Sequence, residues 1–74
     1  MIREHDRVVL TADLPDDGLI AGDVGVVVHI YAGGRGYEVE FFTLTGTTAT
    51  VASIAAESLR AVRREDRLHV RVAA

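Results

Sequence analysis

The sequence predicts an all-β domain, a small barrel or sandwich of five short strands. Runs rich in valine, threonine and aromatic residues recur about every ten residues, and turns rich in glycine, proline and aspartate separate them. A chain of 74 residues without cysteine forms one domain at most, and neither disulfides nor thiolate-bound metals are available to stabilise it. Self-association or a bound partner would add the stability that so small a core lacks.

The N-terminal part of the chain is expected to form one strand and one loop. In residues 4–10, Val9 has apolar neighbours on both sides, which is typical of a strand covered on both faces. Residues 11–18 are expected to form a loop, in which a proline presets a turn that two aspartates and a glycine complete. Leu14 and Leu19 should fold inward and hold this loop against the core.

A tight bend, followed by the most hydrophobic run of the chain, organises the other elements. Gly22 and Asp23 make the bend, and Gly25 marks a place where a backbone passes close or a bulge is needed. We interpret these three residues as structural. The strand after the bend has a more and a less apolar face: Val24, Val26, Val28 and Ile30 on the first, and Val27, His29 and Tyr31 on the second.

The remaining strands are expected to follow in hairpins. We expect a glycine-rich loop at residues 32–36, a strand at 37–43 and a second strand at 47–54. A single 3₁₀ turn at 55–59 and a short closing strand at 60–62 are expected to follow. The first of these strands alternates strictly, with Tyr37, Val39 and Phe41 pointing to the core and Glu38 and Glu40 to water.

The barrel is expected to span residues 1–62, and residues 63–74 form a C-terminal tail. Arginines are concentrated in the tail, and Leu68, Val70 and Val72 alternate with polar residues. This pattern fits a sixth strand, and equally an arm that becomes ordered on a partner, as in strand exchange between two copies of a homodimer.

Charge and hydropathy restrict the location and the partners. No apolar run approaches the length of about 20 residues that a membrane span needs, and the charged N-terminus differs from a signal peptide. We therefore expect a cytoplasmic protein that does not contact membranes. The net charge of −3 divides into −5 over residues 1–40 and +2 over residues 41–74. An acidic body repels phosphate backbones, so the expected partner is a protein with a basic surface and not a nucleic acid.

Four segments, taken together, resemble a known family. They read E-H-D-R-V-V-L, L-P-D-D-G-L, G-D-V-G-V-V-V and Y-E-V-E-F, at residues 4–10, 14–19, 22–28 and 37–41. The set is similar to a family of small bacterial proteins of unknown function, and the order of the elements resembles an SH3-like barrel of the KOW type. This resemblance implies a five-stranded SH3-like barrel that acts as a non-catalytic accessory or antitoxin-like partner of a neighbouring gene product. The chain departs from KOW domains at the bend, where Asp23 stands in place of lysine.

The sequence carries no pattern typical of a catalytic, metal or phosphate site. Ser53 and Ser58 lie outside any nucleophile motif, and His5, His29 and His69 lack the spacing of metal ligands. The glycine-rich loop precedes a strand and not a helix, so it does not form a phosphate cradle. We expect neither enzymatic activity nor a metal or other cofactor.

Protein binding is the function that the sequence favours. SH3-like barrels commonly bind partners between the long first loop and the next hairpin, and acidic groups beside amphipathic aromatics suit a basic partner. The resemblance therefore predicts a partner surface made of Asp13, Asp16, Asp17, Tyr31, Tyr37 and Phe42. Two structural alternatives stay open: in one the tyrosines pair across the hairpin loop, and in the other the tail covers Phe42.

Two other functions remain as alternatives. A KOW-like domain that binds RNA or ribosomes would use Arg63, Arg64 and Arg67 of the tail, because arginine suits phosphate. Against this alternative, Glu65 and Asp66 interrupt the arginines, and the tail has no aromatic residue on which bases could stack. The third function is that of a small subunit of a larger enzyme.

Overall fold

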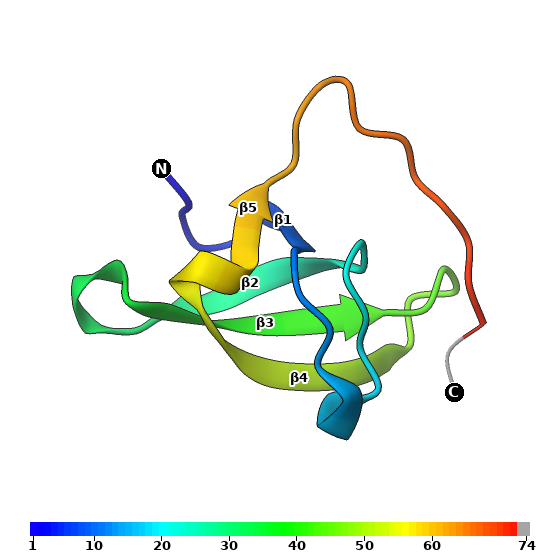
Figure 1. Ribbon diagram of the computed structural model, residues 1–74, viewed down its shortest axis with the longest axis horizontal. Helices are drawn as coiled ribbons and strands as arrows, with labels where there is room; N and C mark the ends of the chain where they lie inside the picture. The colour runs from blue at the N-terminus through cyan, green and yellow to red at the C-terminus, as the bar shows by residue number, and fades with distance from the viewer. Residues whose placement is uncertain (73–74) are drawn as a thin grey trace.

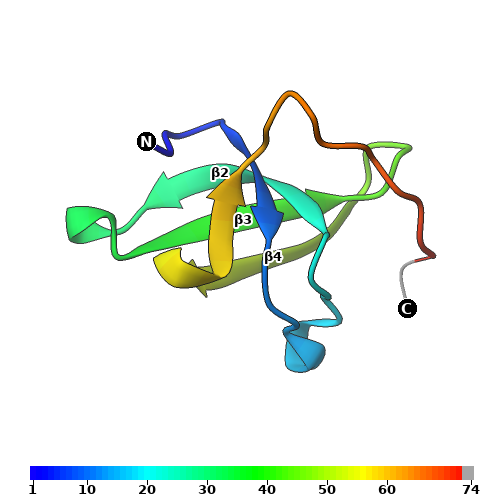
Figure 2. The ribbon, with the colours of Figure 1, turned by 45° about the horizontal axis from the view of Figure 1, so that its top comes forward.

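The computed structural model describes the backbone of residues 1–72 and the side chains of residues 1–47 and 50–72. In this part of the chain, five strands form one twisted antiparallel sheet in the order β4-β3-β2-β1-β5 (Figures 1 and 2). The elements are β1 (Arg7–Leu10), η1 (Pro15–Asp17), β2 (Val24–Ile30), η2 (Ala32–Gly34), β3 (Gly36–Phe42), β4 (Thr48–Ala55), η3 (Ala56–Ser58) and β5 (Leu59–Ala61), where η marks a 3₁₀ turn. The predicted all-β class is confirmed. No helix of the described residues is long and apolar enough to cross a membrane.

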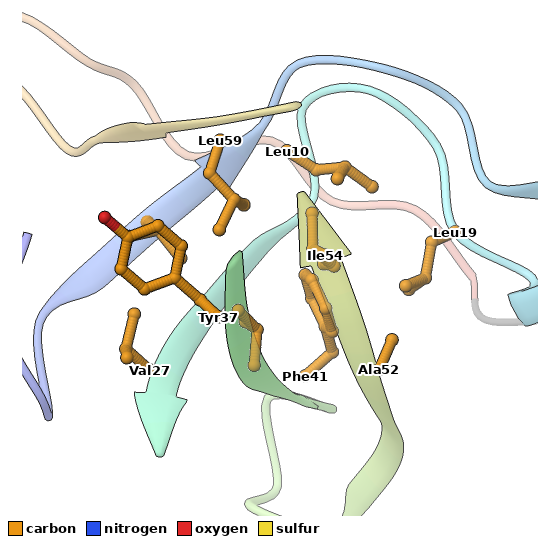
Figure 3. Packing of buried hydrophobic residues seen from close by; sticks show 10 residues of the cluster. Leu10, Leu19, Val27, Tyr37, Phe41, Ala52, Ile54 and Leu59 are labelled. Carbon is orange, nitrogen blue, oxygen red and sulfur yellow. The ribbon is translucent and has the colours of Figure 1, made fainter. Parts of the chain in front are cut away.

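Side chains from every strand meet in one hydrophobic core (Figure 3). The predicted alternation of β3 is confirmed, since Tyr37, Val39 and Phe41 are buried. All three apolar residues of β1 are buried as well, as expected for a strand covered on both faces. The buried members of the core cluster are Val8, Leu10, Leu19, Val27, Tyr37, Val39, Phe41, Ala52, Ile54 and Leu59.

The inner face of β2 is the opposite of the face that its composition favours. Val27 is 0% exposed, whereas Val28 lies exposed on the outer side of the sheet. The pairing with β3 shifts by one residue between Val27 and His29, so Val28 is the extra residue of a β-bulge. Beyond the bulge the alternation is inverted, and Ile30 packs against the core.

The two glycines of the bend region have different roles. Gly22 has a φ of +98° in the turn of residues 20–23, a conformation that favours glycine. Gly25 has no positive φ and lies before the bulge. A β-carbon at Gly25 would lie 2.6 Å from Val39 Cγ1 and 2.9 Å from the Glu40 carbonyl oxygen, so Gly25 allows two strands to pack closely. Of the two roles expected for Gly25, the close approach is confirmed and the bulge is wrong.

The first strand is shorter than expected because the motif E-H-D forms a turn. The amide of Asp6 donates to the Arg3 carbonyl oxygen (3.1 Å), and its carboxylate accepts from the Arg3 amide (2.9 Å). His5 has a φ of +73° in this turn, and its amide donates to the Val27 carbonyl oxygen (2.7 Å). β1 therefore begins at Arg7 and not at residue 4.

The long loop before β2 is fastened at its base, as the sequence predicts. The amides of Leu14 and Leu19 each donate to the other residue's carbonyl oxygen, at 2.9 and 3.1 Å. Leu19 is buried, and Leu14 packs against the core. η1 lies at the tip of the loop, where its aspartates face solvent.

The tail runs back across the molecule without joining the sheet. Residues 62–72, which we call the arm, leave β5 and extend past the hairpin between β3 and β4 (Figure 1). Residues 62–72 thus form no sixth strand, and residues 73 and 74 of the predicted tail lie outside the described residues.

Candidate functional site

Asp66 fixes the arm where it leaves the barrel. The Arg60 guanidinium of β5 donates to both carboxylate oxygens of Asp66, Nη1 to Oδ2 and Nη2 to Oδ1, each at 2.9 Å. The backbone amide of Arg63 donates to Oδ2 as well (2.6 Å). These bonds, that from Arg60 above all, lower the pKa of Asp66 to about 2. A bidentate ion pair of this kind fixes the relative orientation of the two side chains as well as their distance.

Arg71 fixes the far end of the arm to the bend before β2. Its Nε donates to Asp23 Oδ1 (2.8 Å), and its Nη2 donates to Asp23 Oδ2 (2.6 Å) and to the Gly18 carbonyl oxygen (2.9 Å). Asp23 also accepts a hydrogen bond from the Ile20 amide (3.0 Å). The hydrogen bond from Arg71 is the main cause of the lowered pKa of Asp23. Asp23 thus shapes the bend and holds the arm.

An open groove lies between the arm and the barrel. Its volume is about 1120 Å³, and it adjoins a smaller hollow of about 370 Å³ beside Phe42 and Leu44. The arm does not fill the groove, because Leu68 remains 79% exposed and Val70 81% exposed. The exposed apolar side chains that line the groove are Ile20, Phe42, Leu44, Val62, Leu68 and Val70.

Charged groups at the groove are arranged unevenly. Asp23 and Asp66 belong to the two ion pairs that hold the arm. Asp17 lines the groove at the end formed by the long loop, and Asp16 beside it is exposed. Asp13 instead stabilises the loop itself, because its Oδ1 accepts from the Ala21 amide (2.8 Å). The groove is therefore mainly apolar, with acidic residues beside the end formed by the long loop and with two exposed arginines, Arg7 and Arg67, elsewhere in its lining.

The predicted partner surface is brought together only in part. Phe42 is 43% exposed and lines the groove, as Asp17 does. Leu68 lines the small hollow beside Phe42 but leaves the Phe42 side chain exposed. Tyr31 lies at the start of the hairpin between β2 and β3. This hairpin is away from the long loop in both views (Figures 1 and 2). Tyr37 is 8% exposed and belongs to the core, so its side chain does not contribute to a surface.

Tyr31 takes part in a polar cluster on the outer face of the sheet. Its hydroxyl donates to Glu38 Oε1 (3.1 Å) and is 3.0 Å from Ser53 Oγ. The ring of His29 meets the Tyr31 ring edge-on, with centroids 5.0 Å apart. These contacts tie β2, β3 and β4 together across their exposed face. Among the described residues, no group of three or more His, Asp or Glu side chains is placed to hold a metal ion.

The arginines of β5 and of the arm are divided between structural and exposed positions. Arg63, Arg64 and Arg67 are exposed, and Arg67 lines the groove and donates to the Glu65 carbonyl oxygen (3.2 Å). Two other arginines, Arg60 and Arg71, hold the arm in place. The sequence did not identify these two ion pairs. The sequence assigned Asp23 to the bend. Its ion pair with Arg71 depends on the path of the arm.

The molecule is thus a small all-β domain with an apolar groove under a C-terminal arm. Its residues 4–61 match the family described as a domain of unknown function (DUF4926), and the chain belongs to this family. The matched segment begins in the turn before β1 and ends with β5, so it contains every strand named above. Neither the curated proteins nor the solved structures include a match to the chain.

Proposed function

We propose that the protein is a non-catalytic protein-binding module, and that the groove under the arm receives an extended segment of a partner protein. The observation that carries this proposal is the set of apolar side chains left exposed on both walls of the groove. Contiguous apolar surface of this kind is typical of interaction sites, and exposed aromatic side chains often supply much of the binding energy.

The expected partner is a protein whose bound segment combines apolar and basic residues. The apolar residues would pack against Phe42 and Leu44, and the basic residues would lie near Asp16 and Asp17. Charge complementarity of this kind raises the association rate and selects the partner. The strand order β4-β3-β2-β1-β5 supports an SH3-like barrel, and the resemblance of the sequence supports an accessory or antitoxin-like role in the cytoplasm.

Co-purification from the native host tests this function. The protein carries an N-terminal tag, because the C-terminal arm forms one wall of the groove, and each sample is divided into nuclease-treated and untreated halves. We expect one protein in stoichiometric amount that survives nuclease. Leu44→Glu should weaken its binding about 30-fold, the effect of losing about 2 kcal/mol at a central contact. Leu44 is 88% exposed, so this variant should fold normally.

Val28→Glu is the matched control, because Val28 is exposed on β2 outside the groove. A complex that disappears with nuclease and with loss of Arg63, Arg64 and Arg67 would overturn the proposal in favour of RNA binding. A partner retained equally by Leu44→Glu and the wild-type protein would show that the groove is not the binding site.

A further inference from the structure

The two edges of the sheet differ in length and charge. β5 has three residues, and arginines lie within it and shortly after it. β4 has eight residues, and in the described part of the chain only β3 pairs with it. Charged residues are absent from the whole of residues 41–56, the longest uncharged stretch of the sequence. Monomeric proteins usually protect an exposed edge with charges, proline or a bulge. The pairing of β4 with β3 shifts between Thr48 and Thr50, so β4 has a bulge at its start, but no charge or proline protects the rest of the strand.

The hydrogen-bonding pattern identifies which groups of β4 are available. The Ala56 amide donates to the Arg35 carbonyl oxygen (3.0 Å), and the pairing continues in register from Ala55 to Thr50. Because hydrogen-bonded pairs alternate along antiparallel strands, Thr50, Ala52 and Ile54 direct their backbone groups towards β3. Val51, Ser53 and Ala55 therefore direct their amides and carbonyls away from the sheet.

We propose that β4 pairs with β4 of a second copy of this chain, in antiparallel orientation about a two-fold axis. The self-pairing follows from the composition of the edge: it carries no charge that would repel its own image, and an antiparallel pair of identical strands satisfies both edges at once. Val51 is 48% exposed near the middle of β4, so the two copies of its side chain would come together near the axis. The arm is a poorer occupant, because Arg71 holds it at Asp23 of its own chain.

The mass in solution gives the first test. Pairing along one strand buries less than a standard interface, so sedimentation should be followed from about 5 to about 500 µM. We expect the mass to rise from 8.0 kDa towards twice that value. Val51→Lys, which places a charge on the edge, should weaken the dimer at least tenfold, whereas Val28→Lys, on the central strand β2, should not.

Amide exchange of the full chain then locates the interface. Between the lowest and highest concentrations, exchange at Val51, Ser53 and Ala55 should slow about tenfold, while Thr50, Ala52 and Ile54 stay protected throughout. Protection of the last three amides in Val51→Lys also shows that this variant is folded. A constant monomer mass would overturn the proposal, as would a dimer that persists in Val51→Lys and disappears when residues 67–74 are deleted.

Discussion

Replacing Gly25 by alanine tests how closely β2 and β3 pack. The new β-carbon would lie 2.6 Å from Val39 Cγ1, 2.9 Å from the Glu40 carbonyl oxygen and 3.0 Å from Phe41 Cδ1. Val39 is completely buried, and the carbonyl oxygen belongs to the sheet backbone, so neither atom can move away cheaply. Gly25→Ala should therefore cost the protein more than a typical surface substitution.

The size of the effect follows from two opposing contributions. Overpacking of a filled core costs about 3 kcal/mol at the upper end of its usual range. Alanine also restricts the unfolded chain, which returns on the order of 0.7 kcal/mol. The net loss of about 2 kcal/mol corresponds to a fall in melting temperature of about 10 °C for a domain of this size.

Thermal and urea unfolding followed by circular dichroism measures this loss. Gly46→Ala is the matched control, because Gly46 has a φ of +91° with open space around it and would report backbone strain without a clash. The double variant Gly25→Ala/Val39→Ala should be less destabilised than the sum of the single variants, because it removes one of the colliding atoms. A Gly25→Ala protein that melts within a degree or two of wild type would refute the close-packing argument.

Two further predictions concern the ion pairs of the arm. Arg71→Gln should speed amide exchange over residues 67–72 but change the free energy of unfolding of the barrel by less than about 1 kcal/mol; a large loss would mean that the arm is integral to the fold. The pKa of Asp66 falls from its ordinary value of 3.8 to about 2 on folding, so its ion pair stabilises the protein above pH 3.8, and this contribution is lost as the pH falls towards 2. Asp66→Asn should weaken that acid-side decline in unfolding measurements, and an unchanged decline would contradict the role of this ion pair.

The sequence predicted those parts of the fold that depend on local patterns. Strict alternation identified the buried face of β3, and the leucines on either side of the acidic turn identified the fastened loop. The faces of β2 were not predictable in this way, because alternation does not reveal where Val28 interrupts the pairing with β3. The position of the bulge depends on how two strands fit together, and the pattern within one strand does not show this fit.

The candidate site was predictable to a smaller extent. Exposure of Phe42 followed from its place beside the inward-pointing Phe41, and this prediction is confirmed. The groove itself depends on the path of the arm, which the contacts of Arg60 and Arg71 determine. Both contacts join residues whose proximity depends on tertiary structure, and the sequence shows only that acids and arginines are present.

Photocrosslinking in the native host tests the groove most directly. A photoreactive amino acid is placed at Leu44 in the groove and, in a second protein, at Val28 on the outer face of the sheet. We predict that the Leu44 position crosslinks to one protein, with the same yield after nuclease treatment, and that the Val28 position does not crosslink to it. Crosslinks from Leu44 to RNA, or equal crosslinking of one protein from both positions, would contradict the assignment of the groove as a protein-binding site.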